Sequence, residues 1–132
     1  IACRVRGTAT GGEFRLGIYQ AFSLTDLYPN NLIVDAGTFS ATTTGVRRGT
    51  IDVDLQANTL YWLVCTVGTT INFTGILTDD SFAILGIDGN FSQMESSIMV
   101  GTQSYGTLPA TFPIGAQFNT GTAIGIGISF LT

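Results

Sequence analysis

Few side chains in this sequence could do acid–base or nucleophilic chemistry. The chain contains no histidine and no lysine, so it lacks the usual proton shuttle near neutral pH and the usual partner of a serine or cysteine nucleophile. Carboxylate pairs remain, such as Asp79 or Asp80 with Glu95, and such a pair can serve a glycosidase. Asp79 and Asp80 stand between Thr78 and Ser81, a composition that favours a solvated turn. We therefore expect no enzyme, no catalytic residue and no cofactor.

The segment 88–96, DGNFSQMES, has some features of a calcium-binding loop. Asp88, Asn90 and Ser92 offer oxygen atoms at alternate positions. The glycine that should follow is missing, and Met99 stands at the twelfth position, where such loops carry a bidentate glutamate. A hairpin turn rich in Asp and Asn explains the segment better, so we expect no metal site.

Aromatic rings and amides near predicted loops are groups that suit a sugar-binding surface. The candidates for contact with a receptor or glycan are Tyr28, Asn30, Asn31, Asp88, Asn90 and Phe91. No spacing rule selects one site among them. The alternative is that the rings fill the ends of a β-sandwich.

Composition limits the class of partner. The chain has 132 residues, a charged fraction of 11% and a net charge of −4. Nucleic acid is not expected as a partner because binding it needs a basic stripe. Membrane insertion is not expected either, because no apolar run approaches the roughly 20 residues of a membrane span. A surface with so little charge does little to keep small domains apart, so we expect the chain to bind other copies of itself.

The two cysteines, Cys3 and Cys65, both fall in strand-like segments. Two cysteines do not define a disulfide framework. The separation of their Cα atoms decides whether a bridge can form, and the sequence does not show it. A bridge remains open, and two buried free thiols are the favoured alternative.

Strands dominate the expected structure. Helical periodicity is nearly absent, and turn signals recur at roughly the 8–12-residue spacing of a sandwich or barrel. Phe14, Leu16 and Ile18 alternate with polar or small residues, and segment 51–55 alternates in the same way, as half-buried antiparallel strands do. The sequence predicts an all-β, antiparallel β-sandwich, jelly-roll-like, of about eight strands. We interpret residues 1–132 as a single domain, the C-terminal part of a longer polypeptide. The strand segments are 1–6, 14–20, 32–39, 49–55, 60–67, 71–76, 82–87, 97–104 and 123–131, with turns at 11–12, 29–31, 42–45, 68 and 88–90.

Segment 60–67, LYWLVCTV, is apolar on both faces. A strand of this kind is covered on both faces. One cover is the opposite sheet, and the other is a long loop or another subunit. We expect Trp62 to anchor the core, and Tyr61 and Leu63 on the other face to approach an oligomer interface.

The final stretch, TAIGIGISFLT at 122–132, alternates isoleucines with small residues. The isoleucine face is expected to enter the core. Gly125 and Gly127 leave the other face bare, which allows another backbone to approach closely and places both glycines at an oligomer interface. The alternative is that they lie beneath a large aromatic side chain such as Phe118 or Tyr105.

Four segments in a fixed order carry a resemblance to a known family: FRLGIYQA, LYPNNLIVDAGTFSATTTGV, GTIDVDLQANTLYWLVCTVGT and SYGTLPATFPIGA. They resemble a β-rich domain that is common in tail-fibre, head-fibre and spike proteins of tailed bacteriophages. The match spans about residues 13 to 130. The resemblance implies a trimeric domain that closes a longer fibre polypeptide, and the chain resembles no enzyme family.

Each matching segment also has a physical interpretation. Arg15 is expected to pair across strands with Asp52 or Asp54. Leu108 and Phe112, in LPATFP, are expected to close one end of the sandwich. Segment 77–93, LTDDSFAILGIDGNFSQ, departs from the family pattern, so receptor specificity is expected there.

The leading hypothesis is a virion structural domain at the distal end of a tail or head fibre or spike. As a homotrimer on the virion, it would contact other virion proteins and a glycan or protein of the host surface. One alternative is a capsid decoration (cement) protein that stabilises the shell. An alternative of another class is a secreted bacterial carbohydrate-binding module.

Overall fold

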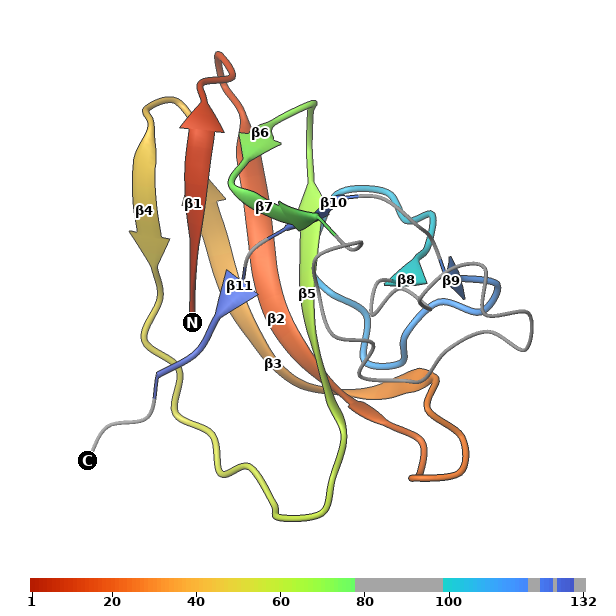
Figure 1. The fold of residues 1–132 in the computed structure, drawn as a ribbon. Coiled ribbons are helices and arrows are strands. Elements are labelled where there is room, and N and C mark those ends of the chain that lie inside the picture. Colours follow the sequence, from red (N-terminus) through yellow and green to blue (C-terminus); the bar gives the residue numbers. More distant parts are fainter. Residues whose placement is uncertain (78–98, 119–121, 125, 130–132) are drawn as a thin grey trace.

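The computed structural model describes residues 1–77, 99–118, 122–124 and 126–129. Within these ranges the chain is all-β, with two main antiparallel sheets and no helix (Figure 1). Accordingly, no described helix is long and apolar enough to cross a membrane. The predicted all-β class and antiparallel pairing are confirmed.

Sheet A is built around its first strand. Its members are β1 (Ala2–Gly7), β4 (Gly45–Arg48), β6 (Asn72–Phe73) and β11 (Ile126–Gly127). β1 lies between β4 and β11, so that Ala2 is opposite Arg48 on one side and Gly127 on the other. β6 pairs with β1 farther along, where Val5 is opposite Phe73.

Sheet B has the order β3-β2-β5, and all its pairs are antiparallel. Its strands are β2 (Glu13–Ala21), β3 (Pro29–Ser40) and β5 (Tyr61–Val67). The alternation predicted for β2 is confirmed, because Phe14, Leu16 and Ile18 are all buried on one face. Two short ladders lie outside these sheets, β7 (Gly75–Leu77) with β10 (Thr122–Ile124) and β8 (Met99–Val100) with β9 (Gln117–Phe118).

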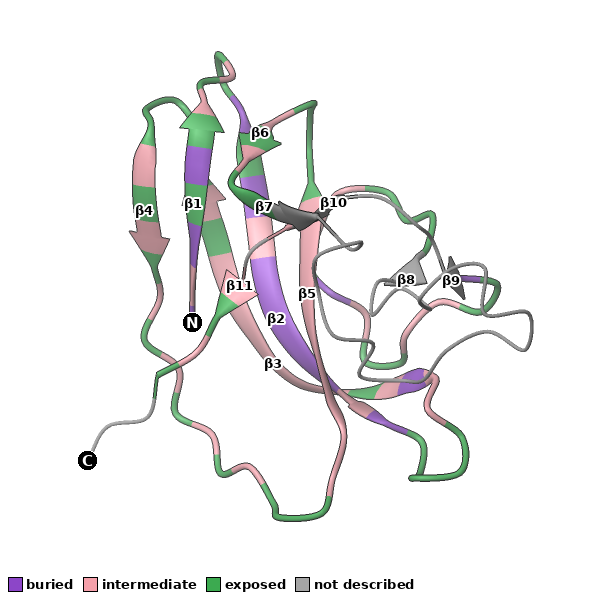
Figure 2. Cartoon of the chain, in the orientation of Figure 1, coloured by how far each residue is buried: buried purple, intermediate pink, exposed green. Residues whose placement is uncertain are grey.

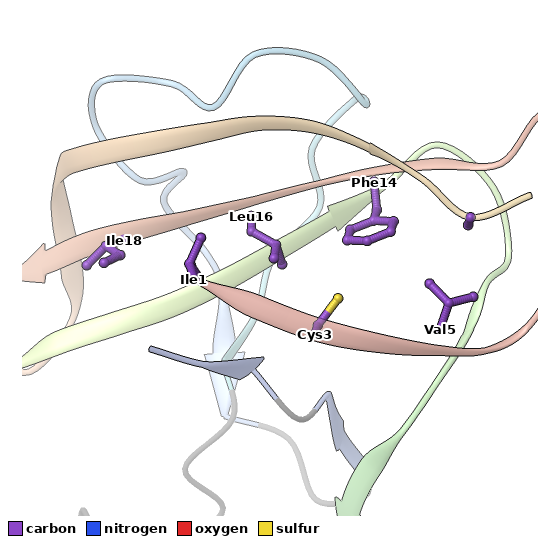
Figure 3. Packing of buried hydrophobic residues seen from close by; sticks show 7 residues of the cluster. Ile1, Cys3, Val5, Phe14, Leu16 and Ile18 are labelled. Atoms are coloured by element: carbon purple, nitrogen blue, oxygen red, sulfur yellow. The ribbon is translucent and has the colours of Figure 1, made fainter. Parts of the chain in front are cut away.

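One hydrophobic core joins the two sheets. Its buried members are Ile1, Cys3, Val5, Phe14, Leu16, Ile18 and Ala41 (Figure 3). Phe14 of sheet B stacks on Phe39 of its own sheet at a centroid distance of 5.4 Å and meets Phe73 of sheet A edge-on at 5.0 Å. Such ring pairs add to the stabilisation that burial alone provides.

The predicted strand at 49–55 is wrong. The pairing register places Arg48 opposite Ala2, so the chain beyond Gly49 runs past the end of β1 and pairs with no strand among the described residues. The alternation itself persists there: Ile51 and Val53 pack against the core, while the residues between them are exposed (Figure 2).

The predicted turn at 29–31 is also wrong. β3 already begins at Pro29, a position that suits proline because the first residue of a strand need not donate to the ladder. The chain reverses earlier, at residues 22–28. The turn at 11–12 is confirmed, with Gly11 at φ 65° and Gly12 N donating to Ala9 O at 2.8 Å.

The remaining strand predictions have mixed outcomes. Segment 71–76 contains two short strands, β6 and β7, and the described part of 123–131 is likewise split between β10 and β11. In 97–104 the described strand is β8 alone, and segment 82–87 lies outside the described residues.

The expectation that Trp62 anchors the core is wrong. Tyr61, Leu63 and Cys65 are the β5 side chains that pack against the core cluster. Trp62 belongs to the opposite face of β5, is half-buried, and donates from Nε1 to Leu27 O at 2.8 Å. Both faces of this strand are apolar, so the alternation alone did not reveal which one entered the core.

Candidate functional site

The outer face of sheet B, opposite the core, is covered by residues 105–116, which we call the strap. Leu108 is buried against β2, where its side chain occupies the space next to Gly17. Leu108 N donates to Asp35 Oδ2 of β3 at 3.0 Å. The strap is therefore a cover for this face that comes from the same chain, one of the two covers considered from the sequence.

Three aromatic residues hold the strap in place: Tyr19 of β2, Tyr28 just before β3, and Phe112 of the strap itself. Tyr19 OH donates to Pro109 O at 2.6 Å, and Tyr28 OH donates to Pro113 O at 2.6 Å. The Phe112 ring meets both tyrosine rings edge-on, at centroid distances of 5.1 Å from Tyr19 and 6.0 Å from Tyr28. Leu108 and Phe112 thus cover a sheet face, whereas the sequence had suggested that they close an end.

The strap also pairs with the beginning of β3. Leu32 N donates to Ala110 O and Phe112 N donates to Asn30 O, both at 2.8 Å. Between these two bonds, Asn31 is opposite Thr111 in an antiparallel bridge. The strap is consequently held by main-chain hydrogen bonds as well as by side-chain packing.

The predicted receptor-contact residues fall into three groups. Tyr28 uses its hydroxyl to hold the strap, and it also accepts a hydrogen bond from Ala116 N at 2.9 Å. Asn30 is half-buried and Asn31 is exposed beside the strap. The other three, Asp88, Asn90 and Phe91, lie outside the described residues.

The structure exposes a surface that the sequence analysis missed, the turn at residues 22–28, which we call the tip turn. Phe22 and Leu24 are 67% and 64% exposed there. A third apolar side chain, Ile114 of the strap, is 97% exposed. It follows Pro113, whose carbonyl oxygen accepts a hydrogen bond from Tyr28 OH at the end of the tip turn. The sequence carries a weak signal for it, because Phe22 and Leu24 alternate with the turn-forming residues Ser23, Thr25 and Asp26.

The tip turn is rigidly hydrogen-bonded. Ser23 N donates to Asp26 O at 2.9 Å, and Asp26 N donates back to Ser23 Oγ at 2.8 Å. Tyr28 N donates to Asp26 Oδ1 at 3.2 Å, and Phe22 N closes the turn on Tyr28 O at 3.0 Å. Its exposed side chains are therefore presented on a preorganised backbone, which lowers the entropic cost of binding.

An ion pair lies beneath the strap. Arg15 NH2 is 3.0 Å from Asp35 Oδ2, and this is the salt bridge found among the described residues. Burial alone raises the pKa of the Asp35 carboxyl. The hydrogen bonds from Leu108 N, Arg15 and Gly37 N, together with the charge of Arg15, outweigh that effect and hold the pKa below its ordinary value of 3.8. The expected pairing of Arg15 with Asp52 or Asp54 is wrong, since the partner comes from the adjacent β3.

Cys3 and Cys65 are free thiols. Both belong to the core region, Cys3 as a buried member and Cys65 packed against it. Burial raises the pKa of Cys3 to about 11, with a smaller opposing effect of Arg47, and raises that of Cys65 to about 12. Among the described residues, no three His, Cys, Asp or Glu side chains form a group that could hold a metal ion.

The residues predicted at an oligomer interface lie in different environments. Tyr61 and Leu63 pack against the core, so packing within one chain accounts for their apolar character. Gly127 is exposed, and a Cβ built on it would meet nothing within 4 Å. Tyr105 covers Gly68, where its ring atoms would lie as close as 3.2 Å to an added Cβ. Gly125 lies outside the described residues.

Comparison of the chain with known proteins identifies no relative. No model of a protein family, no curated protein and no solved structure matches it. The features that bear on function are therefore those of the molecule itself: the two sheets, the strap and the tip turn.

Proposed function

We propose that this chain is a virion structural domain of a tailed bacteriophage, from the distal end of a tail or head fibre or spike. It assembles as a homotrimer and contacts a glycan or protein of the host surface. Its sheets form a jelly-roll-like sandwich of about eight strands. It acts by binding and not by catalysis.

The observation that carries the proposal is the contact between two segments of the family resemblance. FRLGIYQA forms most of β2, and SYGTLPATFPIGA contains the strap that covers it. Three residues of the first segment contact the second segment directly or through one other residue. Arg15 pairs with Asp35, which accepts a hydrogen bond from Leu108 N. Gly17 leaves room for the Leu108 side chain, and Tyr19 OH donates to Pro109 O. The residues that carry the family resemblance thus form one packing unit, and this supports the resemblance more strongly than the sequence match alone.

Contact with a host surface is supported by the tip turn. Phe22 and Leu24 are held outward on a rigid turn, and exposed apolar side chains beside polar groups are typical of binding sites. The exposed amide of Asn31 lies on the strand that follows this turn. A glycan would find an aromatic ring for its apolar face and polar groups for its hydroxyls.

The experiment is a binding assay of the purified chain on an array of bacterial surface polysaccharides. The double variant Phe22→Ser/Leu24→Ser should keep the melting temperature and lose at least about tenfold in affinity, because the apolar contacts are removed. Val67→Ser, at an exposed apolar position on β5, is the matched control and should bind like the wild type. Equal binding by the double variant, or no binding by the wild type, would contradict the proposed glycan contact at the tip turn.

A further inference from the structure

The outer face of sheet A gathers most of the arginines of this acidic chain. Arg4 and Arg6 are exposed on β1, and Arg48 is exposed on β4. The register places Arg48 opposite Ala2 and Val46 opposite Arg4, so the three arginines share one face. Arg47 is not on this face, because the register places it opposite the core residue Cys3. Its guanidinium donates to Ser40 O at 2.8 Å and to Thr43 Oγ1.

Two carboxylates continue this face beyond the end of β4. The exposed positions recur at every second residue from Val46 through Arg48 and Thr50 to Asp52 and Asp54, while the residues between them are half-buried (Figure 2). Asp52 and Asp54 therefore lie on the side away from the core, since Ile51 and Val53 between and beside them pack against it. One surface carries a basic half on β1 and β4 and an acidic half on segment 52–54.

The spacing of the two halves matches. Arg4 and Arg6 are two residues apart on β1, a step of about 7 Å along a strand. Asp52 and Asp54 are likewise two residues apart, on the segment where exposed and half-buried residues alternate. The small residues Ala2 and Gly127 lie side by side next to Arg48. Because a Cβ on Gly127 would meet nothing within 4 Å, a neighbouring molecule can approach the backbone closely there.

We propose that the outer face of sheet A binds a second copy of this chain, with Arg4, Arg6 and Arg48 of one copy against Asp52 and Asp54 of the next. This inference rests on the self-association proposed above and names its surface. Because the basic and acidic halves are different patches, the basic half of one copy can bind the acidic half of the next copy. This is the head-to-tail contact that a closed ring requires. The net charge of −4 disfavours the other occupant, a polyanion, because the rest of the chain would repel it.

The test combines salt with charge reversal, read as molar mass by light scattering at micromolar concentration. The association constant should fall about tenfold or more between 50 mM and 500 mM NaCl, because exposed ion pairs are screened. Asp52→Arg/Asp54→Arg and Arg4→Asp/Arg6→Asp should each weaken association about 10–100-fold through like-charge contacts. An equimolar mixture of the two variants should associate better than either alone, since each supplies the half that the other has lost. Glu13→Arg, an exposed reversal on sheet B, should change association little.

The outcomes separate this inference from the proposed function. A wild type that associates equally in low and high salt, together with charge-reversed variants of unchanged mass, would show that copies meet through another surface and would overturn the inference alone. Dextran sulfate serves as the probe for a polyanion. The inference would also be overturned if the wild type bound dextran sulfate tightly, the variant Arg4→Asp/Arg6→Asp did not, and both proteins self-associated equally. A wild type that is monomeric under all conditions would overturn the proposed assembly itself.

Discussion

The side chain of Leu108 occupies the space in which a side chain on Gly17 would stand. Gly17 is central in β2, so this contact ties the strap to the middle strand of sheet B. A methyl group at residue 17 must displace Leu108, and it would also lie 2.8 Å from Val34 O. The carbonyl of Val34 is part of the backbone and cannot move away as a flexible side chain can. Any residue larger than glycine at position 17 is therefore unfavourable.

Gly17→Ala should therefore lower the free energy of unfolding by about 1–3 kcal/mol, the usual cost of overpacking. Urea denaturation followed by tryptophan fluorescence measures it, because Trp62 is on the same face of sheet B. The matched control is Gly106→Ala within the strap, where an added Cβ would meet nothing within 4 Å. Equal stability of the two variants would mean that Leu108 does not pack on Gly17.

Acid should destabilise the protein through Asp35. Its pKa is lower in the folded chain than its ordinary value of 3.8, so its contribution to stability is present above that value and is lost as the pH falls through the folded pKa. Asp35→Asn keeps the shape but not the charge, and it should be less stable than the wild type at pH 7 while losing less stability on acidification. Glu13→Gln, at an exposed carboxylate, is the control. Parallel pH–stability curves for Asp35→Asn and the wild type would refute the role given to the ion pair.

The two thiols should be inert in the folded protein. A pKa of about 11 for Cys3 and about 12 for Cys65 leaves little thiolate at pH 8, and the thiolate is the reactive form. Ellman's reagent should react slowly with the native chain and with two thiols per chain in 6 M guanidinium chloride. Because both values are raised above the ordinary 9.0, stability should fall as the pH rises beyond about 9. Rapid reaction of either thiol in the native state would contradict the burial described for the core.

The inward face of β2 was predictable because one pattern was enough to define it. In β2 the alternation of Phe14, Leu16 and Ile18 with smaller or polar residues admits one inward face. In β5 the same logic failed for Trp62, because both faces are apolar and the outer face meets a distant segment, where Leu27 O accepts a hydrogen bond from Trp62 Nε1. An alternation rule contains no information about a cover so distant in the chain.

Partners across a sheet were harder to predict than strands. The sequence favours Asp52 or Asp54 as the partner of Arg15 because their segment alternates so regularly, yet the register of β2 with β3 brings Asp35 to it. Register depends on where each strand begins, and β3 begins at Pro29, inside what the sequence suggested was a turn. The same misplaced boundary hid the tip turn and its exposed Phe22 and Leu24.

The proposed assembly of this two-sheet domain into a fibre component is tested most directly by its molar mass in solution. Multi-angle light scattering of the purified chain at micromolar concentration and low salt should give three times the chain mass of 13.9 kDa. A stable, soluble species of 13.9 kDa under those conditions would contradict the claim.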